Sequence, residues 1–595
     1  MKKNVRFKIL FGIMLLMSLG SCSDFLDRAP TAELDVDQVF SDFELAKKYQ
    51  LRLYATLRGG FFEFAEDDYS VDWGYDLLSN MDDHSLHSKS DCSTQELIKG
   101  GWTGVRSEKT TWGAGLAVAR KWRFSYQAIR SINIFLENYS RVPLASMEQQ
   151  KEMDILVGEA YFLRAHHYLE LVKRWGGVPI MRDIIAPDKN YRPVREDVKT
   201  CLDYIVEDCM FAAEKLPVKV SSLWEGRVTK GAALGLKART LLYGASPYWV
   251  QKGSGITWKQ AADAALEVIN LKDENGAPVY ELLSDYRDVF LKNFNKEIIY
   301  CENTSTKQFW GYYTIVPTLM GGFSNGMMAS QEFVDCYEIK DEVSGKYVPF
   351  DRNNPEHMAN MYNKDRRDPR FDMTLFYNGS KWQGETLGFY EGGNVWPKEG
   401  DKNFYLGYCF KKYLNESVRG ASMGGIGAGG TFVFNWIFMR YADVLLMYAE
   451  AQNQVGGPNS IGGDGVGGLT ALQALNLVRN RGGHGISEIA SSISPDDFDE
   501  KVRNERAVEL VIEDQRFFDV RRWNIADQVL SKPLHGVKTI KVGDTFQYDF
   551  NHTDGPVRKK WDNREQYFLY PINIEELQRN PNLEQNPGWI DIVRE

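Results

Sequence analysis

The chain has 595 residues, about four times the length of a typical domain of ~150 residues, although a uniform helical architecture can reach this length as one unit. Hydrophobic residues make up 43% and charged residues 26%, which excludes a disordered chain, a collagen-like chain and a coiled-coil rod. The formal net charge of −10 argues against a nucleic-acid-binding protein, which needs a basic surface.

The N-terminus has the pattern of a lipoprotein signal peptide. A basic start is followed by the short apolar stretch Ile9–Leu19, which is too short for a spanning helix of ~20 residues. The run Leu19–Cys22 resembles a bacterial lipobox, so we expect residues 1–21 to be removed and Cys22 to carry lipid. An ordinary secretory signal with a chance cysteine is the alternative. Removal of residues 1–21 takes away four basic residues and no acidic ones, which makes the net charge −14.

The remaining six cysteines are scattered and form no CxxC pair. Cys201 and Cys209 lie eight residues apart on a predicted helix, about 12 Å along its axis, which is too far for a disulfide. We therefore expect most of the six to be free, buried thiols.

Helical signals dominate the two ends of the chain. The residues Ser41–Glu44 form a capping-box pattern that opens a helix closed by Gly59-Gly60, and apolar spacing continues the pattern from Trp122 to Asn133. Ser494-Pro495 is a strong helix start. Further helices are predicted over 148–174, 195–215, 228–250, 258–270, 434–455, 469–481 and 495–523.

Pairs of small residues recur seven positions apart on three of these helices: Gly158 with Ala165, Ala238 with Ala245, and Ala442 with Ala449. Seven residues are close to two helical turns, so each pair lies on one face and lets a neighbouring helix approach closely. Helix pairs with such seams are typical of degenerate tetratricopeptide units, which favours a mostly α, helical-repeat scaffold.

Two stretches lack this periodicity. Residues 271–433 are rich in Gly, Asn, Asp and aromatic residues, with a predicted hairpin turn at Asp341–Lys346. The segment 61–115 has a similar texture. The chain contains 15 Trp, 30 Tyr and 32 Phe, more rings than a single core needs, which indicates exposed aromatic platforms of a binding protein.

Motifs for catalysis or cofactor binding are weak. Two GxGxxG matches, at 425–430 and 463–468, follow no predicted strand, and no GxxxxGK[ST], HExxH or GxSxG motif occurs. His84 and His87 beside Asp82 and Asp83 could ligate a metal, but two histidines without a fixed third ligand more often belong to a surface loop. We expect no metal and no cofactor.

Charged residues on two C-terminal helices favour a structural role. The charges between Glu505 and Asp519 follow i, i+3 and i, i+4 spacings, which predicts an ion-pair ladder along the helix and not a catalytic pair. Arg440, Asp443 and Glu450 lie on an apolar helix and are expected to be members of a buried polar network.

The chain resembles the SusD/RagB family of outer-membrane nutrient-binding lipoproteins. The resemblance rests on ordered motifs that span nearly the whole mature chain: Gly158–Ala165, Trp175–Pro179, Arg367–Arg370, Arg440–Ala451, Asn476–Arg481, Glu505–Leu510, Asp519–Trp523 and Gln585–Trp589. It implies about four tetratricopeptide-like helix pairs with a loop-rich subdomain that contains small β-hairpins. We expect a single domain over 22–595, with the scaffold at about 36–270 and 434–595. The ligand-binding subdomain is then about 271–433 with loop 61–115.

The resemblance also implies a function. Such proteins are lipid-anchored on the outer face of the outer membrane, bind oligosaccharides or in some branches peptides, pair with a SusC-like TonB-dependent transporter, and are not enzymes. Stacking of sugar rings on aromatic side chains favours a glycan ligand, while a peptide would more naturally use an apolar groove or a strand edge. Two further functions stay open on the sequence alone: a cell-surface glycosidase and a purely structural scaffold without a small ligand.

The predicted ligand site lies on the aromatic loops. Rings occur there without helical or strand periodicity, so core packing does not explain their spacing, although any one ring could still simply fill the subdomain. Two carboxylates near the first cluster could accept hydrogen bonds from sugar hydroxyls. The candidate residues are Trp73, Tyr75, Asp82, Asp83 and Trp102 before the first hallmark motif, and Trp310, Tyr312 and Tyr313 in the insertion.

Overall fold

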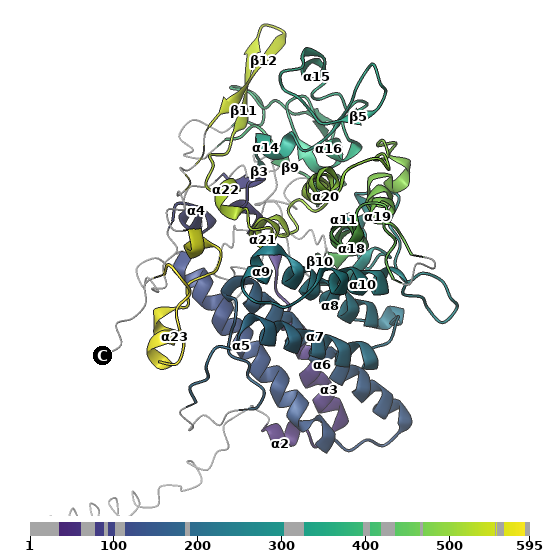
Figure 1. Ribbon diagram of the computed structural model, residues 1–595, viewed down its shortest axis with the longest axis vertical. Coiled ribbons are helices and arrows are strands. Elements are labelled where there is room, and N and C mark those ends of the chain that lie inside the picture. The colour runs from purple at the N-terminus through teal and green to yellow at the C-terminus, as the bar shows by residue number, and fades with distance from the viewer. Residues whose placement is uncertain are drawn as a thin grey trace, which may run out of the picture.

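The computed structural model describes residues 35–60, 78–88, 93–100, 114–184, 191–302, 327–396, 405–417, 435–463, 468–553, 555, 558 and 564–589. An array of long helices occupies one end of the elongated molecule, and short strands and loops occupy the other (Figure 1). We call these two parts the helical scaffold and the loop-rich subdomain. The described core of the subdomain is residues 327–396 and 405–417.

The helical scaffold is a chain of neighbouring helices. From α5 onward the packing order is α5, α6, α7, α8, α10 and α18, with α19 and α20 both on α18. This order is the helix-pair arrangement that the sequence predicts. The helix bounds are α2 Val36–Val39, α3 Phe43–Arg52, α4 Ser93–Ile98, α5 Ala114–Asn138, α6 Met147–Trp175, α7 Val198–Lys215, α8 Lys230–Ala245, α9 Pro247–Gln251, α10 Trp258–Ile269, α18 Tyr441–Gly456, α19 Ala471–Arg479, α20 Pro495–Glu509, α21 Arg516–Arg522, α22 Ala526–Val529 and α23 Ile574–Arg579.

Small residues make the close helix contacts possible. All six members of the predicted seven-residue pairs are buried. A methyl group on Gly158 of α6 would lie 3.0 Å from side-chain atoms of Lys215 and Leu216 at the end of α7. The close approach of α6 and α7 therefore needs a small residue at this position.

Several predicted helix boundaries are wrong for physical reasons, as three cases show. The first helix begins one residue later than predicted, because Asp42 and not Ser41 caps it by accepting a hydrogen bond from the Leu45 amide at 2.9 Å. The predicted helix over 228–250 is divided into α8 and α9 at Ser246, since Pro247 starts the second helix. The predicted helix over 434–455 begins as strand β10, Trp436–Arg440, which pairs with β2, Ile298–Glu302.

The loop-rich subdomain contains short antiparallel strands around a second apolar core. Its four-stranded sheet has the order β1-β3-β9-β6, and the hairpin predicted at Asp341–Lys346 is confirmed as the connection between β4 and β5. The remaining bounds are β1 Ser85–His87, α11 Asp288–Leu291, β3 Met327–Ala329, α14 Gln331–Val334, β4 Ile339–Lys340, β5 Tyr347–Val348, α15 Pro355–Ala359, α16 Pro369–Thr374, β6 Leu375–Phe376, β7 Lys381–Trp382, β8 Glu385–Thr386, β9 Cys409–Phe410, β11 Gly536–Val542 and β12 Thr545–His552.

A buried network of ion pairs joins the two parts. Arg440 at the start of α18 donates hydrogen bonds to Glu297, Glu509 and Glu513 at 2.7–2.9 Å. Arg370 of α16 binds Glu509 from the side of the subdomain. The predicted ion-pair ladder along one helix is therefore wrong in its geometry: most of these charges pair between elements, in the core. The predicted buried roles of Arg440, Asp443 and Glu450 are confirmed.

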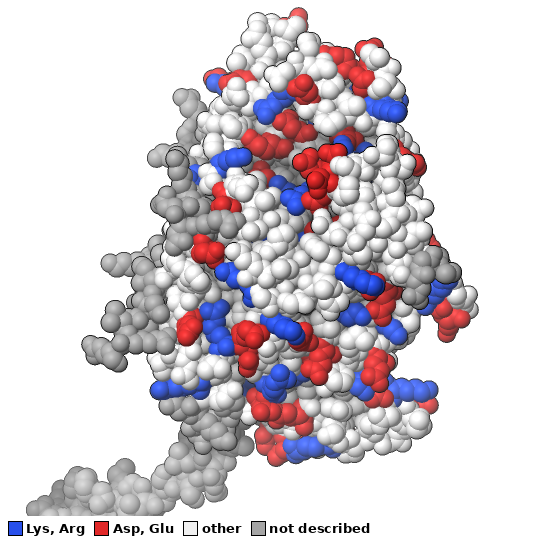
Figure 2. Space-filling view, viewed as in Figure 1, with Lys and Arg blue, Asp and Glu red and all other residues white. Residues whose placement is uncertain are grey.

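Surface charges and cysteines agree with the sequence analysis. Basic and acidic side chains are interspersed over the helical part of the face in Figure 2. Some charges form exposed ion pairs, such as Lys259 with Asp263 at 2.6 Å. The five described cysteines are free, and four of them are buried. Among the described residues, no helix combines the length and the hydrophobicity that a membrane crossing needs.

Candidate ligand-binding site

The structure describes two of the predicted site residues, Asp82 and Asp83. Both lie in the turn that leads from a short 3-10 helix, Leu78–Met81, into β1. Cys22 and the six predicted rings, Trp73, Tyr75, Trp102, Trp310, Tyr312 and Tyr313, lie outside the described residues. Their roles stay predictions.

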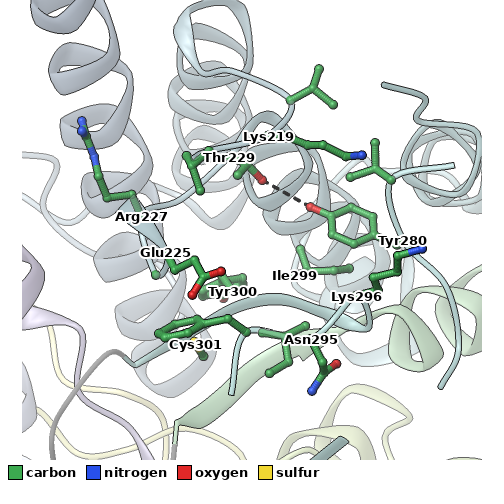
Figure 3. Close-up of a pocket in the computed structure, with 16 residues that line it drawn as sticks. Lys219, Glu225, Arg227, Thr229, Tyr280, Asn295, Lys296, Ile299, Tyr300 and Cys301 are labelled. Carbon is green, nitrogen blue, oxygen red and sulfur yellow. Dashed lines mark hydrogen bonds between the residues drawn. The ribbon is translucent and has the colours of Figure 1, made fainter. Parts of the chain in front are cut away.

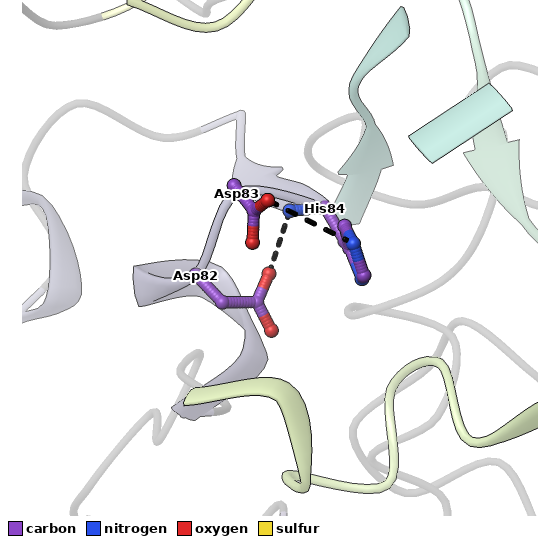
Figure 4. Close-up of side chains that lie close together, drawn as sticks. All are labelled: Asp82, Asp83 and His84. Carbon is purple, nitrogen blue, oxygen red and sulfur yellow. Dashed lines mark hydrogen bonds and ion pairs between the residues drawn. The ribbon is translucent and has the colours of Figure 1, made fainter. Parts of the chain in front are cut away.

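The Asp82–His84 turn is buried and rigidly held (Figure 4). The Asp82 carboxylate accepts a hydrogen bond from the His84 amide at 2.8 Å. Both carboxylate oxygens of Asp83 accept hydrogen bonds from Arg516 of α21 at 2.8 Å. Because Asp83 is only 7% exposed and is held by Arg516, this turn connects the subdomain sheet to the scaffold. A direct contact with a sugar hydroxyl stays a prediction for both carboxylates.

The pKa values of the three side chains in this turn are shifted, and the two carboxyl groups shift in opposite directions. Burial raises the pKa of Asp82 well above its ordinary value, and the neighbouring Asp83 adds to the rise. Burial also raises the pKa of Asp83, but the Arg516 guanidinium outweighs this effect and the pKa falls below the ordinary value. Burial lowers the pKa of His84 to about 3, so its ring is neutral at physiological pH.

The ligand atoms of Asp82, Asp83 and His84 lie within 4.8 Å of one another, a spacing that could hold a cation. Two guanidinium groups already face the turn, since Arg516 binds the Asp83 carboxylate and Arg558 donates to the Asp82 carbonyl at 2.5 Å. They balance the two carboxylates, which disfavours a divalent ion here. His84 and His87 are both buried, so the interpretation of them as surface-loop residues is wrong.

A pocket of about 230 Å³ lies beside β2, immediately before the segment that contains the predicted Trp310 cluster. We call it the β2 pocket. Its walls come from the α7–α8 connection, from residues 279–280, and from residues 294–301. Figure 3 shows Lys219, Thr229 and Tyr280 on one side, Asn295 and Cys301 on the other, and the Arg227 side chain turned away. The Thr229 and Tyr280 hydroxyls lie 3.3 Å apart.

The lining of the β2 pocket combines aromatic surface with polar groups of little net charge. Phe294 and Tyr280 supply ring surface. The three cations of the lining are neutralised by carboxylates outside it: Lys219 by Asp273, Lys296 by Glu281, and Arg227 by Glu152 and Glu159. Burial raises the pKa of Tyr280 to about 12, so its hydroxyl stays protonated and can donate.

Sequence reasoning missed the β2 pocket because its residues come from three distant segments. Phe294 adopts a left-handed backbone conformation, with φ of 52°, that no residue pattern predicts for an aromatic side chain. The only usable sequence signal was the nearby density of rings after residue 300.

Comparisons with known proteins identify the fold family. A family model described as "SusD family" matches residues 292–589, half of the chain, and one described as "Starch-binding associating with outer membrane" matches residues 24–242. The chain belongs to the SusD family. The SusD-like proteins P25 and P38 of Formosa agariphila are 23% and 24% identical to it, with at least 97% of each chain covered.

Solved SusD-like structures share the fold. A SusD-like protein of Bacteroides fragilis is 26% identical, with 94% of this chain and 100% of that chain covered and a TM-score of 0.73. A SusD-like carbohydrate-binding protein of the same species is 22% identical, with 92% and 100% covered and a TM-score of 0.69. A laminarin-binding SusD-like protein is 20% identical, with 92% and 100% covered and a TM-score of 0.58.

Proposed function

We propose that this SusD-family protein is a cell-surface lipoprotein that captures oligosaccharides. The observation that carries the proposal is the lining of the β2 pocket, where ring surface from Tyr280 and Phe294 lies beside neutral hydroxyl and amide groups. A sugar presents C–H faces that pack on rings and hydroxyls that need hydrogen-bond partners, so such a lining suits it. The predicted Trp310 cluster follows β2 in the sequence, and we propose its rings as further stacking surface.

Family membership supports the same ligand class. One matching family model is described as starch-binding, and two solved relatives are described as carbohydrate-binding and laminarin-binding. The neutralised cations of the β2 pocket favour a neutral glycan over a sulfated or uronate-rich one.

We further propose that the protein delivers its ligand to a SusC-like TonB-dependent transporter and has no hydrolytic activity of its own. Lipid at Cys22 would hold it at the extracellular face of the outer membrane, and a binder without a channel needs a partner for import. Co-purification from native outer membranes under mild detergent tests the pairing; repeated recovery of the protein alone would contradict it.

A peptide ligand is the second candidate, and one observation favours it. Strand β12 pairs only with β11 among the described residues, so its other edge has no strand there, and extended peptides bind such edges. A glycan array beside a peptide panel separates the candidates. Binding to glycans alone supports the first proposal, and binding to peptides alone contradicts it.

A further inference from the structure

A second pocket lies on the helical scaffold and shares no lining residue with the β2 pocket. Its volume is about 410 Å³, and we call it the α5–α23 pocket. One face of α5 forms its floor, the segments at 179–184 and 191–193 form one wall, and α23 with the following turn forms the other. Figure 1 shows α5 and α23 on the same side of the scaffold.

The walls of the α5–α23 pocket are apolar and held in place. Trp122 is 6% exposed, and its ring lies 5.0 Å from that of Tyr126, measured between centroids. The Tyr126 hydroxyl donates to the Pro179 carbonyl at 2.9 Å, and Asn133 donates to the Met181 carbonyl at 2.8 Å. These bonds connect α5 to the wall, so the cavity is preformed, as small-molecule sites usually are.

The opposite wall is fixed in the same way. Asn580 after α23 donates from its side chain to the Pro193 carbonyl at 2.7 Å. Leu583 adds an apolar group and is 3% exposed. The side-chain donors that hold the two walls are thus already hydrogen-bonded to backbone carbonyls. The inner surface therefore suits the apolar part of a ligand.

The rim carries an excess of positive charge in a protein whose net charge is −10. The charged side chains there are three arginines, Arg123, Arg130 and Arg579, and two acids, Asp183 and Glu576, so the formal charge of the lining is +1. Arg579 is bound to Glu576 at 3.2 Å. Arg123 is exposed on α5, and no hydrogen bond or ion pair ties it to another part of the described chain.

We propose that the α5–α23 pocket binds a small amphipathic monoanion, with an aromatic ring or short alkyl chain between Trp122 and Met181 and a carboxylate at Arg123. A guanidinium and a carboxylate form strong, charge-assisted hydrogen bonds. The volume falls in the range of small-ligand sites, about 300–1,000 Å³. A lining of 16 residues is smaller than one side of a stable protein interface, which takes about 20–30 residues.

The probe pair 4-phenylbutyrate and 4-phenylbutyramide tests the proposal, since the two differ mainly in charge. Isothermal titration or ligand-observed NMR on the mature protein should show the carboxylate binding at least tenfold more tightly than the amide. Arg123→Gln should remove that preference. Arg52→Gln, which changes an exposed arginine on α3 outside the pocket, is the matched control and should retain it.

A second variant tests the cavity itself. Met181→Trp places a larger side chain in the wall and should weaken both probes at least tenfold, while a glycan identified on the array should bind as it does to the parent. The proposal is overturned if neither probe binds at about 10 mM, if both bind alike, or if Arg123→Gln keeps the preference for the carboxylate. The three results that would overturn the proposal are measured with the two probes alone, so they do not depend on whether the β2 pocket binds glycans.

Discussion

The Arg370 guanidinium lies 2.9 Å from the Glu509 carboxylate, deep between the loop-rich subdomain and the scaffold. Arg370 belongs to α16 and Glu509 ends α20, and each is at most 1% exposed. Arg370 also donates to Asp368 at 2.8 Å and to Glu505. One arginine therefore joins three carboxylates at the boundary between the two parts.

Replacement of Arg370 by alanine should destabilise the protein by about 3–5 kcal/mol, the usual cost of leaving buried charges without their partner. Chemical denaturation followed by circular dichroism measures this loss. Lys259→Ala removes a similar charge from an exposed pair with Asp263 and should cost less than about 1 kcal/mol. Equal effects of the two variants would contradict the role given to Arg370.

Acid should weaken the network through Asp519. Burial opposes ionisation of its carboxyl, but Arg506 and Arg522 outweigh this effect and hold the pKa at about 2, below the ordinary 3.8. The resulting stability, about 2 kcal/mol, is present above about pH 4 and is lost as the pH falls through about 2. The stability advantage of the parent over Asp519→Asn should therefore shrink between pH 5 and 2. An advantage that does not change over this range argues against the shifted pKa.

Much of the helical scaffold could be predicted because its signals are local. The seven-residue spacing of Gly158 and Ala165 depends only on neighbours in sequence. The hairpin turn at Asp341 in the subdomain is local in the same way, since the Asp341 side chain accepts a hydrogen bond from the Ser344 amide at 2.7 Å. The predicted helix over 495–523 fails for a tertiary reason. The Glu509 carbonyl accepts hydrogen bonds from Tyr286, Lys412 and Arg440, so distant donors take the place of a helical one and α20 ends.

The candidate site was less predictable. Asp83 is a predicted ligand contact because it lies near the first aromatic cluster in the sequence, and that prediction stays untested. Its bidentate partner Arg516 is 433 residues away, and sequence spacing holds no information on such a pair. The β2 pocket likewise brings Thr229 close to Tyr280, although three helices, α8, α9 and α10, separate them in the sequence. Predicting these contacts needs the packing order of the helices, which composition and periodicity leave open.

Close packing requires a glycine at position 177, in the hallmark segment Trp175–Pro179. A methyl group there would lie 2.0 Å from the Glu196 carbonyl oxygen. Gly177→Ala should therefore destabilise the protein by about 1–3 kcal/mol through backbone displacement. Gly276→Ala is the comparison: its φ of 78° strains alanine, but no atom lies within 4 Å, so only a conformational cost of about 1–2 kcal/mol remains. In thermal unfolding, the melting temperature of Gly177→Ala should be equal to or lower than that of Gly276→Ala. A melting temperature of Gly177→Ala that equals that of the parent would count against the packing argument.

Lipid attachment is tested at Cys22. The basic, short apolar signal and the run Leu19–Cys22 predict that the mature chain starts at this residue with lipid on it. Cys22→Ala should abolish labelling by a fatty-acid analogue and remove the protein from the cell surface. Cys92→Ala is a control that should leave both unchanged. An intact mass that shows an unmodified N-terminus downstream of Cys22 in the native protein would refute lipidation.

The aromatic loops should hold the glycan. Trp73→Ala, Trp102→Ala and Trp310→Ala each remove one predicted ring, and at least one should weaken binding of the glycan found on the array tenfold or more, about 1.4 kcal/mol. Ring stacking gives weak affinity alone, and the polar groups beside it set the orientation, since an unmatched buried partner costs about 1–3 kcal/mol. The melting temperature should not change, because rings that are exposed, as these three are predicted to be, contribute little to folding. Phe211→Ala removes a ring that is 42% exposed on α7, away from the β2 pocket lining, and should bind like the parent. If all three tryptophan variants also bind like the parent, the site lies elsewhere on the protein.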